Sequence, residues 1–361
     1  IIEHDPDVIA IADHIVEMGP GSGKDGGDVI YEGSLDGLKK ENTPTGYYFG
    51  YKKPLKTLYR KSSDYLLIHN STLHNLKGIS VKIPENVLTV ITGVAGSGKS
   101  SLVKSLIDQY NNIVVIDQKV LQGSKRSNIA TYTGVLDIIR NLFAKQNGVK
   151  KSLFSNNSDG ACPECKGTGV ISTDLAFLDA VEVRCELCNG SGFNPGVLKY
   201  KLKNKSITDI MAMTIREAVA FLHEREITEP LYRLCEVGMD YLTLGQSLNT
   251  FSGGELQRLK LAKELGNAGN VYVFDEPTAG LHGSDISKLM KLFERLVNDK
   301  NTVLIIEHNM DVISQADWII DMGPRAGKEG GKIIFEGFPK DIIASKCSLT
   351  GKYLDIYLHN K

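Results

Sequence analysis

The chain has 361 residues, 42% of them hydrophobic and 24% charged, and its formal net charge is −1 at pH 7. This composition predicts a globular protein long enough for two or more cores. The balance of 42 Lys and Arg against 43 Asp and Glu excludes a chain-wide positive field, so any nucleic-acid contact must come from local patches. Without an apolar run of membrane-spanning length or an export pattern, the sequence predicts a cytoplasmic protein and no membrane partner.

Two segments of the chain, residues 1–33 and 305–337, repeat one another. At a constant offset they share about 20 identities in 33 positions, far beyond chance for a segment of ordinary complexity. Each copy reads as a strand, a histidine, a helix and two further strands. We therefore expect a parent protein with two copies of one domain, of which only the tail of the first is present here. Ile1 is then expected to lie within a buried strand.

A glycine-rich loop, residues 93–100, reads G-x-x-x-x-G-K-S and follows the apolar run 87–92. A strand, a glycine loop and a helix in this order predict a phosphate-binding loop rather than a plain turn, because backbone N–H groups and a helix N-terminus converge on phosphates. Lys99 is expected to reach the phosphates and the Ser100 hydroxyl to bind Mg²⁺. The predicted nucleotide-binding residues of this loop are Gly93, Gly96, Ser97, Gly98, Lys99, Ser100 and Ser101.

Acidic and polar residues follow three further apolar runs, each of the type expected of a buried strand. The run 113–116 leads to Gln118, the run 271–274 to Asp275 and Glu276, and the run 303–306 leads past Glu307 to His308. We expect Asp275 to hold the Mg²⁺ shell and Glu276 to polarise the attacking water, since alternation along a strand turns them to different sides. His308 is expected to contact the γ-phosphate. Glu276, His308 and Gln118 are thus the predicted catalytic residues.

A second anion-binding helix start is predicted at residues 250–258. Its serine and paired glycines stand before a helix with an apolar face. The predicted nucleotide-binding residues here are Ser252, Gly253, Gly254 and Glu255.

Four of the six cysteines form two C-x-x-C-x-G-x-G knuckles. They are Cys162, Cys165, Cys185 and Cys188. Two thiolates on each tight turn suit tetrahedral Zn²⁺, and a site with four thiolates is structural because it has no open position. From the knuckles alone, a protein partner and DNA remain equal alternatives for the insertion.

Basic residues cluster at two places near these motifs. One is the loop after Gln118, and the other has lysines at alternate positions, which we expect on one face of a strand. Taken by their charge alone, the two clusters are interpreted either as solvated surfaces or as contacts with nucleic-acid phosphates. The candidate DNA-binding residues are Lys119, Lys125, Arg126, Lys199, Lys201 and Lys203, with Lys205 continuing the second run.

The order of these motifs resembles that of an ATP-binding cassette: phosphate loop, Gln118, S-G-G-E signature, D-E-P-T, the A-G-L-H turn at 279–282, and His308. The resemblance implies an α/β P-loop NTPase of the ABC ATPase type, with a helical signature subdomain and an inserted zinc-binding module. In this family the signature of one cassette closes over the nucleotide held by another, which explains why the parent chain would carry two copies.

The zinc knuckles, together with residues 126–134, 244–246 and 307–324, closely resemble the second cassette of the UvrA family, the damage-sensing subunit of bacterial nucleotide excision repair. The resemblance implies a homodimer that binds duplex DNA, takes ATP, Mg²⁺ and Zn²⁺, and loads a UvrB-like helicase through the first cassette. The implied domains are 1–40, the tail of the first cassette; 41–64, a linker; 65–118 and 250–361, the second nucleotide-binding core; 119–149 and 200–249, the signature subdomain; and 150–199, the zinc insertion.

Two departures from the family pattern are Ala95, where the family usually has serine, and Phe251, in place of leucine. These departures also fit the alternative function, a UvrA-like paralogue in drug resistance or regulation that acts through protein or ribosome contacts.

Overall fold

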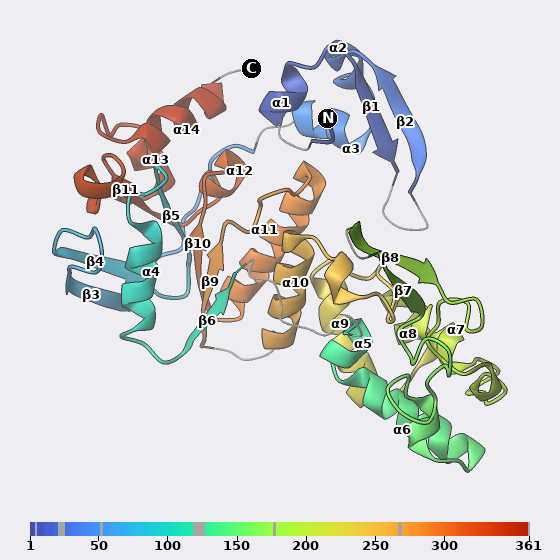
Figure 1. Ribbon diagram of the computed structural model, residues 1–361. Coiled ribbons are helices and arrows are strands. Elements are labelled where there is room, and N and C mark those ends of the chain that lie inside the picture. Colours follow the sequence, from blue (N-terminus) through green and yellow to red (C-terminus); the bar gives the residue numbers. More distant parts are fainter. Residues whose placement is uncertain are drawn as a thin grey trace. The chain divides into compact units, whose positions relative to one another are not determined.

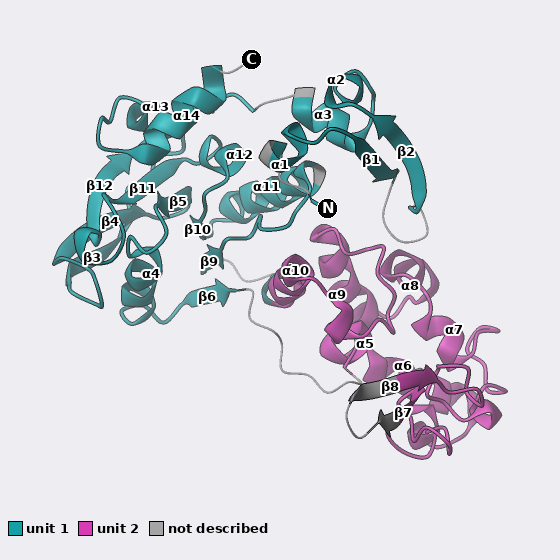
Figure 2. Cartoon of the chain, turned by 45° about the horizontal axis from the view of Figure 1, so that its top comes forward, with its two compact units in different colours: residues 1–119, 264–361 teal, residues 120–263 magenta. Residues whose placement is uncertain are grey.

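The computed structural model describes residues 1–3, 6–20, 26–50, 53–117, 127–175, 178–265 and 269–359. The chain divides into two compact units: unit 1 contains residues 1–119 and 264–361, and unit 2 contains residues 120–263 (Figure 2). Unit 2 is therefore an insertion within the sequence of unit 1. The predictions for Gln118, Lys119, Lys125 and Arg126 lie outside the described residues.

Unit 1 contains both strands and helices, which Figure 1 labels. Its strands are β1 Ile15–Gly19, β2 Asp28–Gly33, β3 Tyr65–Ser71, β4 Ile79–Pro84, β5 Leu88–Gly93, β6 Ile113–Ile116, β9 Val271–Asp275, β10 Thr302–Ile306, β11 Trp318–Gly323 and β12 Lys332–Gly337. Its helices are α1 Pro6–Ala10, α2 Leu35–Leu38, α3 Pro44–Gly50, α4 Lys99–Ile107, α11 Gly283–Asn298, α12 Met310–Ile313, α13 Pro339–Ile342 and α14 Leu349–His359.

The central sheet of unit 1 has the strand order β12-β11-β5-β10-β9-β6, and its strands are parallel except for the β11–β12 pair. The inner strands β5 and β10 are buried along their whole length, as runs of Val, Ile and Leu in a parallel sheet predict. The run 113–116 was also expected to be a buried strand, but β6 is the edge strand and Val115 is 41% exposed. That prediction of burial was wrong because β6 pairs with β9 on one side only.

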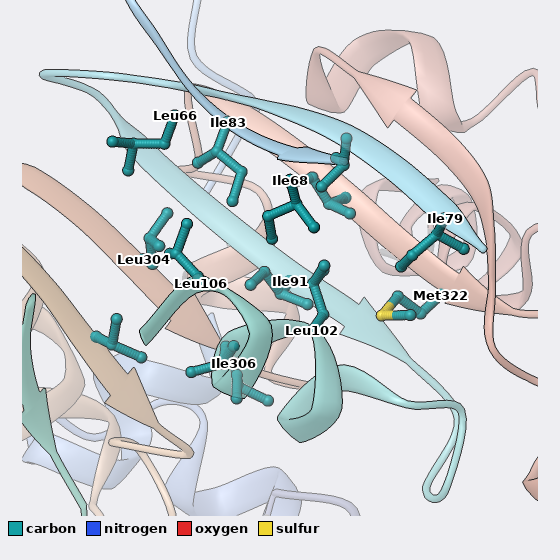
Figure 3. Packing of buried hydrophobic residues seen from close by; sticks show 14 of the residues in the cluster. Leu66, Ile68, Ile79, Ile83, Ile91, Leu102, Leu106, Leu304, Ile306 and Met322 are labelled. Atoms are coloured by element: carbon teal, nitrogen blue, oxygen red, sulfur yellow. The ribbon is translucent and has the colours of Figure 1, made fainter. Parts of the chain in front are cut away.

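Both faces of this sheet are covered. One face packs against α4 and the β3–β4 hairpin (Figure 3), and each apolar side chain buried there contributes about 1.5–3 kcal/mol. On the other face, the ring of Phe274 lies 4.7 Å from that of Phe293 on α11. The labelled residues of the first face are Leu66, Ile68, Ile79, Ile83, Ile91, Leu102, Leu106, Leu304, Ile306 and Met322.

The repeat in the sequence is also a repeat in the structure. The hairpins β1–β2 and β11–β12 pair at the same offset, Ile15 with Gly33 and Ile319 with Gly337, and both have a register shift at the equivalent position. The strand expected around Ile1 is absent, because residues 1–3 have no strand pairing and Ile1 is exposed. In the second copy the equivalent strand is β10, which lies between β5 and β9, whereas the strands among the described residues of 1–64 are β1 and β2, which pair with one another.

Unit 2 contains the remaining helices and the two cysteine knuckles. Its helices are α5 Ile129–Tyr132, α6 Val135–Asn147, α7 Ile207–Met211, α8 Ile215–Phe221, α9 Arg225–Glu236 and α10 Gly253–Glu264, the last of which ends at the unit boundary. Between the two cysteine knuckles, β7 Val170–Leu175 and β8 Leu178–Arg184 form an antiparallel hairpin. Each helix among the described residues is too short or too polar to span a lipid bilayer.

The expected lysine-bearing strand does not form. Leu202 and Lys205 close a tight turn through an isolated bridge, and Lys203 and Asn204 at its tip have positive φ angles. Lys201 lies 3.8 Å from Asp209, and Lys203 donates to the carbonyl of Phe221 at 3.2 Å. The prediction of one lysine face was therefore wrong, because a turn separates the side chains.

Candidate functional site

The candidate nucleotide site lies where parallel strands of unit 1 end together. The register sets Ile306 beside Ile91 of β5 and beside Asp275 of β9. Each strand therefore runs directly into its motif: β5 into the phosphate loop, β9 into the acidic pair and β10 into Glu307 and His308. Ligands of open α/β sheets bind at this carboxyl edge.

The phosphate loop turns sharply from β5 into α4. Gly93 has φ +127°, and a Cβ there would lie 2.0 Å from the carbonyl oxygen of Met322, so this position requires glycine. The amine of Lys99, the first residue of α4, donates to the carbonyls of Gly93 at 2.8 Å and Val94 at 3.1 Å. The lysine is therefore held at the loop, and the start of α4 offers free N–H groups to an anion.

The loop is braced by residues that sequence reasoning missed. The side-chain amide of Asn75 donates to the carbonyl of Gly96 at 3.2 Å. The N–H of Gly327 also donates to Gly96, at 3.0 Å, and the N–H of Gly331 donates to Ser97 at 2.9 Å. The sequence signal for the contact of Gly331 was the glycine pair that both copies of the repeat contain, at 26–27 and 330–331.

The acidic pair adopts an unexpected geometry. Asp275 ends β9, whereas Glu276 has φ +47° and is half exposed. A left-handed backbone, and not strand alternation, therefore turns the two side chains apart. The Nε2 atom of His308 lies 3.8 Å from Oε1 of Glu276, so the structure brings these two predicted residues together.

Burial, and to a lesser extent neighbouring charges, shift the pKa values of three groups at the site. Burial, together with the neighbouring Glu276 and Asp117, raises the pKa of Asp275. Burial lowers the pKa of Lys99, although Glu276 and Asp275 oppose this change. Burial and Lys99 lower the pKa of His308, which favours a neutral imidazole. A cation beside several carboxylates, as here, is an arrangement able to bind a phosphate–metal complex.

Glu307 is a further residue that sequence reasoning missed. Its buried carboxylate accepts hydrogen bonds from the backbone N–H groups of Thr278, at 3.0 Å, and of His308, at 2.7 Å. Glu307 therefore holds the turn after Glu276 in place relative to His308, whose side chain lies beside Glu276. The sequence signal was the identity of Glu3 and Glu307 in the two copies.

The signature residues lie in unit 2, at the start of α10. Ser252 and Glu255 cap this helix reciprocally: the N–H of Glu255 donates to Oγ of Ser252 at 3.3 Å, and the N–H of Ser252 donates to Oε2 of Glu255 at 2.9 Å. Ser252 and Gly253 are exposed. The helix start predicted from the sequence is confirmed, while its contact with a nucleotide stays a prediction.

The candidate metal centre is the cluster of Cys162, Cys165, Cys185 and Cys188. The four Sγ atoms are buried and lie within 4.8 Å of one another. The Sγ separations of 3.9 Å (162 to 185) and 3.7 Å (165 to 188) match the edge of about 3.8 Å of a tetrahedron with Zn–S bonds of about 2.3 Å.

The backbone completes this cluster. The N–H groups of Gly169 and Gly192 donate to Sγ of Cys165 and Cys188 at 3.2 and 3.3 Å, as thiolates require. The four cysteines therefore fit a zinc module.

Fold and site together define a P-loop ATP-binding domain. The family model described as "ABC transporter" matches residues 76–279, more than half of the chain. The chain therefore belongs to the ABC ATPase family, and it is a UvrA-like ABC ATPase.

The UvrA-like assignment rests on relatives that cover nearly the whole chain. UvrABC system protein A of Staphylococcus aureus strain COL is 44% identical over 98% of this chain, and that of Aquifex aeolicus strain VF5 is 40% identical over 99%. The crystal structure of UvrA2 from Deinococcus radiodurans matches with a TM-score of 0.90 and 38% identity, covering 99% of this chain and 48% of the other. The chain spans 41% and 43% of the two curated relatives.

Proposed function

We propose that this chain hydrolyses ATP as part of a DNA-damage-recognition protein of bacterial nucleotide excision repair. The observation that supports hydrolysis most directly is the placement of Glu276 and His308, 3.8 Å apart, at the sheet edge that also carries the phosphate loop. The support for repair is the similarity to proteins named UvrABC system protein A.

In the proposed reaction, Glu276 accepts a hydrogen bond from the attacking water and so raises its nucleophilicity. Lys99 and the N-terminus of α4 hold the β- and γ-phosphates, and His308 contacts the γ-phosphate. Ser100 and Asp275 supply oxygen ligands of the kind that Mg²⁺ prefers, and Mg²⁺ would neutralise phosphate charge. Gln118 is proposed to complete the site, with Gly93, Gly96, Ser97, Gly98 and Ser101 in the loop.

The signature at 252–255 is proposed to close over the nucleotide of another cassette. The proposed active form is a homodimer, and each parent chain is proposed to carry a further cassette. Zn²⁺ held by the four cysteines would stabilise an insertion too small for its own core. A UvrB-like helicase is the proposed partner of the first cassette, and the cytoplasm the proposed location.

Duplex DNA is the proposed ligand. The candidate contacts are Lys119, Lys125, Arg126, Lys199, Lys201 and Lys203, acting on phosphates and not on bases. The alternative function is that of a UvrA-like paralogue in resistance or regulation, which acts through protein or ribosome contacts. Ala95 and Phe251, which depart from the family pattern, also fit this alternative.

The test is duplex binding by the full protein with ATP, measured on intact DNA and on the same duplex with one bulky lesion. We expect affinity that falls as salt rises and that is higher for the lesion. Equal affinity for both duplexes would contradict damage recognition. Selective binding to ribosomes in the same buffer would favour the alternative.

A further inference from the structure

Residues of the predicted linker, 41–64, contact the loops that follow the acidic pair and His308, and the structure describes residues 41–50 and 53–64 of this connecting segment. Its first part forms α3, which packs against α11. The hydroxyl of Thr45, a buried side chain, lies 2.9 Å from Nε2 of His282. His282 closes the A-G-L-H turn that follows the acidic pair. A residue of the connecting segment thus contacts a turn six residues beyond Glu276.

Tyr48 makes the second contact. Its hydroxyl donates to Oδ2 of Asp311 at 2.5 Å, and Asp311 follows His308 by three residues, on α12. Its ring lies so close to the chain that a Cβ on Gly283 would be 2.0 Å from it. The position after His282 must therefore be glycine for Tyr48 to pack here. Thr45 and Tyr48 together contact the turns that follow both Glu276 and His308.

The same segment is bonded to the first copy. The N–H of Thr45 donates to Oε1 of Glu17, a buried side chain of β1, at 2.9 Å. A continuous path of hydrogen bonds therefore runs from Glu17 through Thr45 to His282. It links the hairpin of the first copy to the nucleotide loops of the second.

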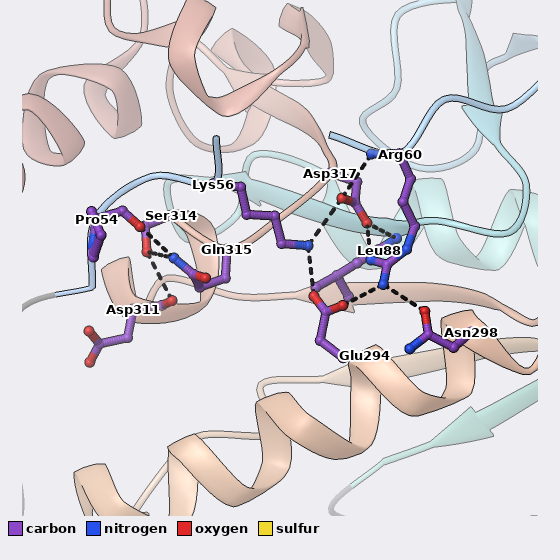
Figure 4. A network of polar contacts seen from close by, with 10 residues as sticks. All are labelled: Pro54, Lys56, Arg60, Leu88, Glu294, Asn298, Asp311, Ser314, Gln315 and Asp317. Carbon is purple, nitrogen blue, oxygen red and sulfur yellow. Dashed lines mark hydrogen bonds and ion pairs between the residues drawn. The ribbon is translucent and has the colours of Figure 1, made fainter. Parts of the chain in front are cut away.

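The far end of the connecting segment is anchored by a polar network (Figure 4). Lys56 and Arg60 both bond Asp317, each at 3.0 Å, and both bond Glu294 of α11, at 2.7 and 2.5 Å. The side chain of Asp317 is only 1% exposed and also accepts from the N–H of Leu88, the first residue of β5, at 3.1 Å. The described residues of the segment are therefore held by Asp317 and Glu294 at one end, and Thr45 is bonded to Glu17 at the other.

We propose that Thr45 and Tyr48 are positioning residues for ATP turnover: they set the A-G-L-H turn and the start of α12 according to the placement of the first copy. The proposal rests on the ATP hydrolysis proposed above. Small displacements of catalytic groups cost large factors in rate, so loops flanking Glu276 and His308 are effective points of control. Nucleotide binding stays unaffected, because the phosphate loop has separate supports at Asn75, Gly327 and Gly331.

The test compares steady-state ATP turnover of the full chain in Thr45→Val, Thr45→Ser and Tyr48→Phe. Tyr353→Phe is the matched control, since Tyr353 is 57% exposed on α14. We expect Thr45→Val and Tyr48→Phe to lower kcat about five- to tenfold, the value of one hydrogen bond, with KM for ATP within about twofold. Thr45→Ser, which keeps the hydroxyl, and Tyr353→Phe are expected to match the wild type.

A double-mutant cycle tests the route of this effect. If Thr45 acts through His282, then Thr45→Val causes no further loss of kcat in a His282→Ala background. If the losses of kcat caused by Thr45→Val and His282→Ala are fully additive, the proposal is overturned. It is also overturned if Thr45→Val and Tyr48→Phe both keep the wild-type kcat in an assay in which Glu276→Gln abolishes turnover. A wild-type chain that neither binds nor hydrolyses ATP would instead contradict the proposed function, and this inference with it. Should Thr45→Val fail to fold, Tyr48→Phe and its kcat decide the question.

Discussion

The carboxylate of Glu307 accepts a hydrogen bond from the backbone N–H of Thr278 at 3.0 Å. This contact joins the loop that follows β10 to the turn that follows β9. The other carboxylate oxygen accepts from the N–H groups of His308, at 2.7 Å, and Asn309, at 3.0 Å. A single buried acid therefore fixes the turn after Glu276 relative to His308. The separation of these two side chains depends on it.

Glu307→Gln is expected to destabilise the chain and to lower kcat. A glutamine amide places N–H donors where the carboxylate accepts N–H groups, so at least one buried donor is left without a partner, at a cost of about 1–3 kcal/mol. Chemical denaturation measures this loss. The control is Glu329→Gln, which removes the charge of Glu329 from its exposed ion pair with Arg325. Its free energy of unfolding should stay within about 0.5 kcal/mol of the wild-type value. Wild-type stability and turnover in Glu307→Gln would refute the role given to this residue.

The anchor of the connecting segment predicts a pH dependence. Burial alone would raise the pKa of Glu294, but hydrogen bonds from Arg60 and Lys56 outweigh it and hold this pKa below its usual value. The folded chain thus binds this proton less readily than the unfolded chain. Its contribution to stability is full above the ordinary glutamate pKa and is lost as pH falls through the lower, folded value.

Glu294→Gln should therefore flatten the acid limb of the stability curve, measured as the free energy of unfolding against pH. The variant is expected to lose more stability at neutral pH than at acid pH. A variant curve parallel to that of the wild type across this range would show that the anchor does not depend on the charge of Glu294.

Zinc is expected at about one ion per chain, from four cysteines around one centre. Cys165→Ser should lower the bound zinc, measured by metal analysis of the purified chain, and should unfold the insertion, because metal binding and folding are coupled. Cys347→Ser is the control, since Cys347 is exposed and lies outside the cluster. Equal zinc content in both variants would disprove the assignment of these ligands.

Much of this fold followed from local patterns in the sequence. Apolar runs that end in Gly93 and Asp275 predicted the inner strands, since parallel strands buried on both faces are near-continuous runs of hydrophobic residues. The repeat predicted the matching hairpins. The edge position of β6 was not predictable, because an edge strand differs from an inner one only by its missing neighbour.

The site was predicted in part. Motif spacing indicated Lys99, Glu276 and His308, because the chemistry requires those residue types after those strands. The roles of Glu307 and Asn75 were not predicted, because their side chains contact backbone groups distant in sequence, and no local pattern encodes such contacts. The lysine strand failed for the opposite reason: alternation of charge alone does not distinguish a strand from the turn that Lys203 and Asn204 form.

The central claim, that Glu276 activates water at an ATP site, is tested most directly by nucleotide retention and turnover in Glu276→Gln. We expect this variant to bind ATP with an affinity within about twofold of the wild type, to turn it over at least about 100-fold more slowly, and to accumulate as a closed dimer with ATP retained. Lys99→Ala, in contrast, should weaken ATP binding itself. Turnover of Glu276→Gln at the wild-type rate would contradict the account.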